Sequence, residues 1–129
     1  MPGKRYLLDT NALVALLKGD VGLIELTKDA DWLGVSVVNV LEFLGFEGLS
    51  ESDRLLFEEL LDRVAVIDLN YKNAPLMNHI TTLRKLRTLK LPDTIVMASA
   101  LLHEATLVTN DSALLTLAQS DKTYSAQAF

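Results

Sequence analysis

Cysteine is absent from the 129 residues of this chain. That absence excludes disulfides, thiolate zinc sites and cysteine nucleophiles together. Histidine is scarce as well, since His79 and His103 are the only two and stand 24 residues apart, without metal-ligand spacing. A metal site in this sequence would therefore need oxygen ligands, which favours Mg²⁺ or Mn²⁺ over zinc.

Long apolar runs are missing too. No run approaches the roughly 20 residues that are needed to cross a bilayer, and the start MPGKRYLL has no long apolar region followed by a cleavage site. We therefore expect a cytoplasmic protein. The composition is 50% hydrophobic and 22% charged, which is typical of globular proteins, and the length suits one domain over residues 1–129.

A surplus of positive charge is also lacking, because the formal net charge is −5. At first sight this argues against a nucleic-acid partner. The distribution is uneven, however: residues 1–68 carry −7 and residues 69–129 carry +2. Four of the bases fall in one short stretch, namely Arg84, Lys85, Arg87 and Lys90. This stretch is either a solvated helix face or a contact for phosphate groups.

Apolar segments of two kinds alternate along the chain. Short segments bounded by polar residues predict buried strands at 4–9, 31–38, 63–69 and 105–111. Segments with helical spacing predict helices at 11–19, 39–48, 50–62, 74–87, 92–104 and 111–119. Their predicted limits include Gly19 and Gly48 as C-terminal stops, Ser50 or Ser52 as an N-cap, and Pro92 in a first turn. Such alternation predicts a parallel sheet with helices on both faces.

Ligands of such sheets bind beyond the carboxyl ends of the strands, so carboxylates at those ends are candidate site residues. Asp9 directly follows the first predicted strand, and Asp111 stands between the last predicted strand and the last helix. Asp93 lies in the first turn of a helix that is apolar on nearly all sides and is therefore expected to be buried. Glu42 lies within the apolar helix that follows the second strand.

Each of these acids also has a purely structural interpretation. Asp9, Asp93 and Asp111 could each be a helix cap or a partner of the helix dipole, contributing about 1 kcal/mol. Glu42 could face solvent together with Asn39, three residues before it on the same side of the helix. The set favours a shared site more than any single member does, because three of the acids stand where the crevice is expected.

Carboxylates that meet in one place cannot all stay ionised without a compensating charge, and a divalent cation supplies it. Such an ion can activate water beside a phosphodiester, so no covalent protein nucleophile is needed. The four acids carry −4 of the net −5. With their charge compensated, the rest of the chain is close to neutral, and a nucleic-acid backbone could approach.

The order of these motifs resembles the PIN domain, and in particular the VapC-like ribonuclease toxins of bacterial toxin–antitoxin pairs. The motifs are Asp9 in LLDTN, Glu42 in NVLEF, Asp93 in LPDTIVMASALL and Asp111 in LVTND, and they span nearly the whole chain. The resemblance implies a Rossmann-like α/β/α sandwich around a central parallel sheet. It also implies an endoribonuclease that depends on one or two Mg²⁺ or Mn²⁺ ions, a homodimer, and an inhibitory VapB-like antitoxin that reaches into the acidic site.

The same resemblance suggests roles for individual residues. The catalytic and metal-binding acids would be Asp9, Glu42, Asp93 and Asp111. Asn11 and Thr109 match polar positions that support those acids. Apart from the resemblance, the basic stretch Arg84, Lys85, Arg87 and Lys90 is the candidate contact for the RNA backbone, because it stands close to Asp93 in the sequence. The chain departs from the family where SALL follows TND, at a place where an acidic or aromatic pair is common, and its tail DKTYSAQAF has too few apolar residues to predict a last strand.

Three other functions remain open at this point. A phosphatase of the haloacid-dehalogenase type needs a second Asp two residues after the first, and this chain has Asn11 there. A receiver domain would use Asp68, after the third predicted strand, as phosphate acceptor, but Asp9 lacks the acidic neighbour that such domains carry. A catalytically silent PIN-like module would bind RNA or a partner without cutting, although the presence of all four acids argues against it.

Overall fold

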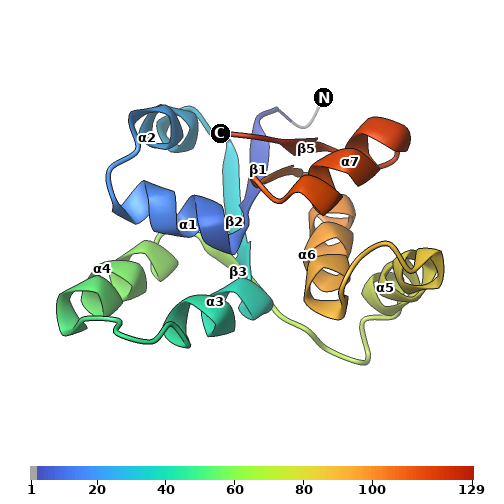
Figure 1. Ribbon diagram of the computed structural model, residues 1–129, viewed down its shortest axis with the longest axis horizontal. Coiled ribbons are helices and arrows are strands. Elements are labelled where there is room, and N and C mark those ends of the chain that lie inside the picture. Colours follow the sequence, from blue (N-terminus) through green and yellow to red (C-terminus); the bar gives the residue numbers. More distant parts are fainter. Residues whose placement is uncertain (1–2) are drawn as a thin grey trace.

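The computed structural model describes residues 3–129 (Figure 1). Met1 and Pro2 lie outside the described residues. They begin the segment MPGKRYLL, in which the sequence predicts no leader. The strands are β1 (Arg5–Leu8), β2 (Trp32–Ser36), β3 (Ala65–Ile67), β4 (Thr106–Val108) and β5 (Ala126–Gln127). The helices are α1 (Thr10–Leu17), α2 (Val21–Lys28), α3 (Val37–Leu44), α4 (Glu51–Leu61), α5 (Ala74–Leu86), α6 (Leu91–Leu102) and α7 (Ser112–Ser120).

The strands of residues 3–129 form one parallel sheet in the order β3-β2-β1-β4-β5. Leu7 of β1 is in register with Gly34 of β2 on one side and with Leu107 of β4 on the other. Along the chain, β2 and β3 extend the sheet on one side of β1, and β4 and β5 then extend it on the other side. The predicted α/β/α sandwich with a central parallel sheet is confirmed, and Figure 1 shows the sheet between two groups of helices.

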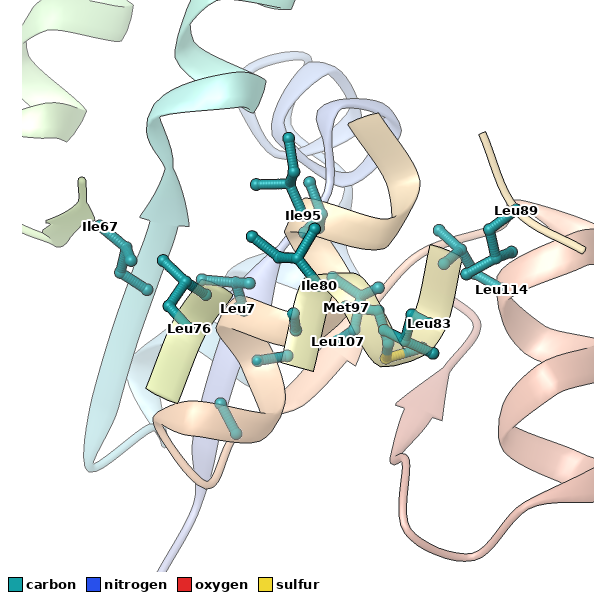
Figure 2. Packing of buried hydrophobic residues seen from close by; sticks show 14 of the residues in the cluster. Leu7, Ile67, Leu76, Ile80, Leu83, Leu89, Ile95, Met97, Leu107 and Leu114 are labelled. Atoms are coloured by element: carbon teal, nitrogen blue, oxygen red, sulfur yellow. The ribbon is translucent and has the colours of Figure 1, made fainter. Parts of the chain in front are cut away.

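Alternate residues of β1, β2 and β4 enter separate hydrophobic clusters on the two faces of the sheet. Leu7 and Leu107 pack with Leu76 on the face that α5, α6 and α7 cover (Figure 2). Leu8 and Val108 belong to the cluster on the opposite face, which receives side chains from α1, α2, α3 and α4. Because successive side chains point to opposite faces, a strand covered on both faces needs apolar residues throughout, which explains the unbroken apolar runs in the sequence.

Helices α3 and α6 carry the candidate acids Glu42 and Asp93. The short helix α3 contacts both α1 and α6. Helix α6 is buried from Thr94 to Ala100, which confirms the expectation from its apolar sequence. Its first turn contains Pro92, as predicted. None of the helices within residues 3–129 is long and apolar enough to cross a membrane.

Some helix boundaries confirm the prediction and others correct it. Gly19 ends α1 with φ of +90°, and its N–H donates to the carbonyl of Leu16, which is the left-handed stop that glycine favours. Ser50 is the N-cap of α4. The predicted helix 39–48 was placed too late, because α3 begins at Val37 and ends at Leu44. Helix α2 was not predicted at all, and β5 does form, as a strand of two residues.

Candidate active site

The four predicted acids line one pocket of about 420 Å³ at the carboxyl edge of the sheet. The lining consists of Asp9, Thr10, Asn11, Val14, Glu42, Phe46, Asp93 and Asp111. Two of the acids come from the ends of β1 and β4, the neighbouring strands between which the direction of sheet building reverses. In doubly wound sheets, that reversal point opens a crevice where ligands bind.

Asp9 is almost completely buried, with 6% of its surface exposed. Its Oδ1 accepts hydrogen bonds from the N–H of Thr10 at 2.9 Å and from Asn39 Nδ2 at 3.0 Å, and its Oδ2 accepts one from Thr109 Oγ1 at 2.6 Å. These bonds occupy three of the roughly four acceptor positions of an ionised carboxylate. Asp9 is also the N-cap of α1, so the capping interpretation is correct for this residue and compatible with a place in the pocket.

Thr109 and Asn11 connect the loop after β4 to the start of α1. Thr109 Oγ1, which donates to Asp9, accepts the N–H of Asp111 at 3.0 Å and a bond from Asn11 Nδ2 at 3.4 Å. Asn11 Oδ1 accepts the N–H of Asn110 at 3.2 Å. The two residues predicted to support the acids therefore lie in direct contact with each other and with the segments that carry Asp9 and Asp111.

Glu42 is connected to Asp9 through two polar side chains. Its Oε1 accepts from Thr10 Oγ1 at 2.8 Å and from Asn39 Nδ2 at 3.2 Å, and Asn39 Nδ2 also approaches Thr10 Oγ1 at 2.9 Å. The Glu42 side chain is exposed, as the solvent-face interpretation required. Its carboxylate nevertheless faces α1, and Asn39 is fully buried rather than sharing an exposed face with it.

Asp93 lies in the first turn of α6, where Lys90 is the N-cap. Asp93 is therefore not the cap, but its place in the first turn agrees with the alternative that it is a partner of the helix dipole; Asp9 and Asp111 are the N-caps of α1 and α7. Burial and repulsion by neighbouring carboxylates together raise the pKa of Asp93 to about 6. These neighbours are, in decreasing order of effect, Asp111, Asp9 and Glu42, and the positive charge of Lys90 opposes them.

The pKa of Asp9 is raised as well, because the carboxyl is buried. Hydrogen bonds from Thr109, Thr10 and Asn39 oppose this effect by stabilising the charged form. The pocket thus combines donors that favour ionised acids with burial and repulsion that disfavour them. A cation among the acids would relieve both unfavourable contributions.

The chemistry of the donor set fits a hard divalent cation, because the acids that line the pocket offer only carboxylate oxygens. Within residues 3–129, no three Asp, Glu or His side chains are already arranged around one metal position. Asp9 and Glu42 both accept hydrogen bonds from Thr10 and Asn39, whereas Asp93 is partly exposed. Binding of an ion would therefore rely on rotation of Asp93 toward the other two acids.

The predicted basic stretch lies at the junction between α5 and α6. Arg84 and Lys85 belong to the last turn of α5, Arg87 is its C-cap, and Lys90 is the N-cap of α6. The first three line a surface hollow of about 540 Å³. Lys90 is near enough to Asp93 to lower its pKa, so this end of the stretch approaches the acidic pocket.

Two polar residues of the site were not identified from the sequence. Asn39 donates toward both Asp9 and Glu42, and Thr10 connects the same two acids. A signal for Asn39 was present, because an amide among Val and Leu residues in an apolar helix, one turn before an acid, is unusual for a core position. Thr10 gave no such signal, since threonine after an N-cap residue is ordinary.

Comparisons with known proteins agree with this fold. A family model described as the PIN domain matches residues 6–119. VapBC-1 from nontypeable Haemophilus influenzae superposes with a TM-score of 0.74 and 22% identity over 96% of this chain and 97% of that one. DNA-bound VapBC from Salmonella typhimurium gives 0.75 and 16% over 97% and 98%, and a toxin–antitoxin complex from Klebsiella pneumoniae gives 0.68 and 24% over 83% and 87%. No curated protein matches the chain in sequence.

The raised pKa of Asp93 predicts how the metal-free protein responds to pH. A carboxyl that is protonated more readily in the folded state stabilises the fold fully below its unfolded pKa, near 3.8, and that contribution is lost as the pH rises through about 6. Asp93→Asn removes this loss. Between pH 4 and pH 7 the free energy of unfolding of Asp93→Asn should therefore improve relative to wild type by about 1 kcal/mol, a value reduced for solvent screening. Urea titrations in excess EDTA measure the difference.

Asp121→Asn is the matched control for this prediction. The N–H and hydroxyl of Thr123 lower the pKa of Asp121, so its stabilising effect is lost only as the pH falls below 4 and is constant in the window tested. Parallel curves for Asp93→Asn and wild type between pH 4 and pH 7 would show that the pocket acids do not repel one another as described.

Proposed function

The chain belongs to the PIN domain family, and from that premise we propose that it is a divalent-metal-dependent endoribonuclease, the toxin of a VapBC-like toxin–antitoxin pair. The observation that carries the proposal is the single pocket at the β1/β4 edge with four carboxylates in its lining. A crevice at that edge is where the fold binds ligands, and in this pocket burial together with repulsion from Asp111, Asp9 and Glu42 raises the pKa of Asp93.

In this proposal Asp9, Glu42, Asp93 and Asp111 hold one or two Mg²⁺ or Mn²⁺ ions. When bound, the ion supplies the positive charge that activates the attacking water and offsets the charge on the departing oxygen. Asp9 is the fixed member, because Thr10, Asn39 and Thr109 determine its orientation. Asn11 and Thr109 hold the loop that carries Asp111 against α1.

The reaction is hydrolysis of a phosphodiester. Water attacks the phosphorus, the bond between phosphorus and the 3′ oxygen breaks, and that oxygen leaves as a hydroxyl after taking up a proton. The products are then a 5′-phosphate and a 3′-hydroxyl. Attack by the ribose 2′ oxygen would instead give a 2′,3′-cyclic phosphate, so the product ends distinguish the two routes.

A basic path toward the pocket supports a nucleic-acid substrate in spite of the net negative charge. Lys90 is the base whose charge lowers the pKa of Asp93, and Arg84, Lys85 and Arg87 stand just before it at the α5–α6 junction. Contacts of this kind bind phosphates without selecting bases. We propose that these side chains hold the RNA backbone beside the acids.

A largely apolar hollow beside the acids supports a protein partner. The hollow, of about 290 Å³, is lined by apolar residues of α1, of the end of α3 and of the segment that follows it, and also by the charged residues Lys18, Glu47 and Asp53. Val14 and Phe46 line both this hollow and the acidic pocket. Leu41, Leu44 and Phe46 are exposed nearby. A VapB-like antitoxin segment with apolar side chains and one basic side chain would fill the hollow and neutralise the acids. The homodimer and the cytoplasmic location implied by the resemblance belong to the same proposal.

Replacing the fixed acid tests the nuclease proposal. Asp9→Asn keeps the shape of the side chain but removes its charge, so metal-dependent cleavage of RNA in Mn²⁺ should fall at least about a hundredfold. Wild type should yield 5′-phosphate and 3′-hydroxyl ends, which end-labelling detects. Asp68→Asn is the matched control, because Asp68 is exposed after the edge strand β3; it should keep full activity. A silent wild type, or cyclic phosphate ends, would refute the proposal.

Arg87 offers a sharp test of the basic path, because its φ of +58° lies in the left-handed region that glycine tolerates best. Arg87→Gly therefore removes the charge while relieving the backbone. We expect unchanged or slightly higher thermal stability, weaker RNA binding, and a slope of log K against log salt that is shallower by about 0.7. Binding is measured by fluorescence anisotropy in the Asp9→Asn background. If Arg87→Gly gives the same slope as the Asp9→Asn protein that keeps Arg87, the basic stretch is a solvated face and does not contact RNA.

The partner proposal predicts that charge in the apolar hollow blocks inhibition. Phe46→Glu places a carboxylate where an apolar partner side chain would pack, and Phe46 is 45% exposed, so the fold should tolerate it. Co-expression with the cognate antitoxin should then fail to protect cells from Phe46→Glu but should protect them from wild type. Val21→Glu, at a side chain that is 74% exposed on α2, is the control. Full protection from Phe46→Glu would exclude this hollow as the docking site.

A further inference from the structure

Asn39 is a fully buried amide on α3 that contributes to the acidic pocket from behind, without lining it. Its Nδ2 lies 3.0 Å from Asp9 Oδ1, 2.9 Å from Thr10 Oγ1 and 3.2 Å from Glu42 Oε1. We propose that Asn39 is a positioning residue that holds Asp9 and Glu42 in one fixed arrangement for the metal. This inference rests on the metal site of the proposed function and assigns a new residue to it.

A purely structural role does not account for Asn39. It occupies the third position of α3, from which a side-chain oxygen can reach back to the N–H of the N-cap residue. The Asn39 Oδ1 makes no such bond, and it is the only buried side-chain polar atom without a partner among residues 3–129. Leaving such an oxygen unpaired in the interior is unfavourable for the fold. The amide therefore gives up local stabilisation, and its donors serve the acids instead.

The direction of the hydrogen bonds gives the amide a defined task. Thr10 Oγ1 donates its only hydrogen to Glu42 Oε1 at 2.8 Å, so it can only accept from Asn39. The two hydrogens of Asn39 Nδ2 are thus shared among three acceptors, all on or beside the two acids. Two of these acceptors are carboxylate oxygens, and the third, Thr10 Oγ1, passes its own hydrogen to Glu42. An amide is suited to this position because it donates without adding charge.

The arrangement also determines which acids move together. Asp9 belongs to α1 and Glu42 to α3, and Asn39 is one turn from Glu42 on the same helix. Without the amide, Glu42 would keep only its bond to Thr10, and repulsion from Asp9 would turn the exposed glutamate outward. Groups that orient metal ligands in this way typically change metal affinity 10- to 100-fold when they are removed.

Mn²⁺ binding without RNA tests this inference, with the free ion measured by electron paramagnetic resonance. Asn39→Leu keeps the branched shape of the side chain, with a larger volume and no donor, and it should raise the dissociation constant for Mn²⁺ at least about tenfold. Asn39→Thr, which keeps one donor, should fall between Asn39→Leu and wild type. Cleavage by Asn39→Leu should be weak at low Mn²⁺ and should recover as the Mn²⁺ concentration is raised. Its melting temperature in EDTA should stay within a few degrees of wild type, since the unpaired oxygen is removed together with the donor.

Ser99→Ala is the matched control, because Ser99 is a buried polar residue whose hydroxyl donates only to the carbonyl of Ile95 within α6. It should leave Mn²⁺ affinity unchanged. Equal Mn²⁺ affinity in wild type and Asn39→Leu would overturn the inference alone, whereas failure of wild type to bind Mn²⁺ would overturn the proposed function as well. If Asn39→Leu does not fold, Asn39→Ala removes the same donor without bulk and decides by the same comparison.

Discussion

The parallel pairing of β1 with β4 determines where the polar groups of the pocket lie. Asp9 follows one strand and Thr109 follows the other, so in-register pairing of Leu8 with Val108 brings them together across 100 residues of sequence. The hydrogen bond of 2.6 Å from Thr109 Oγ1 to Asp9 Oδ2 connects the two segments that follow β4 and β1 at this edge of the sheet. Asp111, two residues further on, is thereby carried to the same pocket. The topology of the sheet thus brings together acids that stand far apart in the sequence.

The second constraint is electrostatic. Acids gathered at the sheet edge are partly buried and repel one another, which shows most strongly in the raised pKa of Asp93. Donors from Thr10, Asn39 and Thr109 stabilise the charge on Asp9, and Lys90 offsets some of the charge near Asp93. The donors from Thr10, Asn39 and Thr109 are neutral, so they orient the carboxylate of Asp9 without adding positive charge. The pocket can therefore still accept a cation. In the proposed function, the divalent ion completes this balance and gives the phosphate groups of RNA a place to approach.

The sequence predicted the parts of the fold that depend on long or strongly apolar segments. Strands that are covered on both faces consist of apolar runs, which the sequence shows directly. The burial of α6 could be predicted because its residues are apolar on nearly all sides. Helix α2 was missed because it is short, contains Gly22 and mixes polar with apolar residues, so it depends on its cap at Asp20 and on packing of Leu23. Asp9 and Asp111 could be located because they follow strands, and Asp93 because it stands in the first turn of an apolar helix. The role of Asn39 could not, since it depends on the approach of α1 to α3, which is a tertiary contact.

The central claim is that the pocket at the β1/β4 edge binds a divalent metal ion through carboxylate oxygens. A crystal structure of the wild-type chain grown with Mn²⁺, with anomalous data collected at the manganese absorption edge, tests it most directly. The account predicts an anomalous peak within bonding distance of Asp9 and of at least one more of the acids Glu42, Asp93 and Asp111. A map in which saturating Mn²⁺ gives no peak in this pocket, or gives its strongest peak elsewhere on the chain, would contradict it.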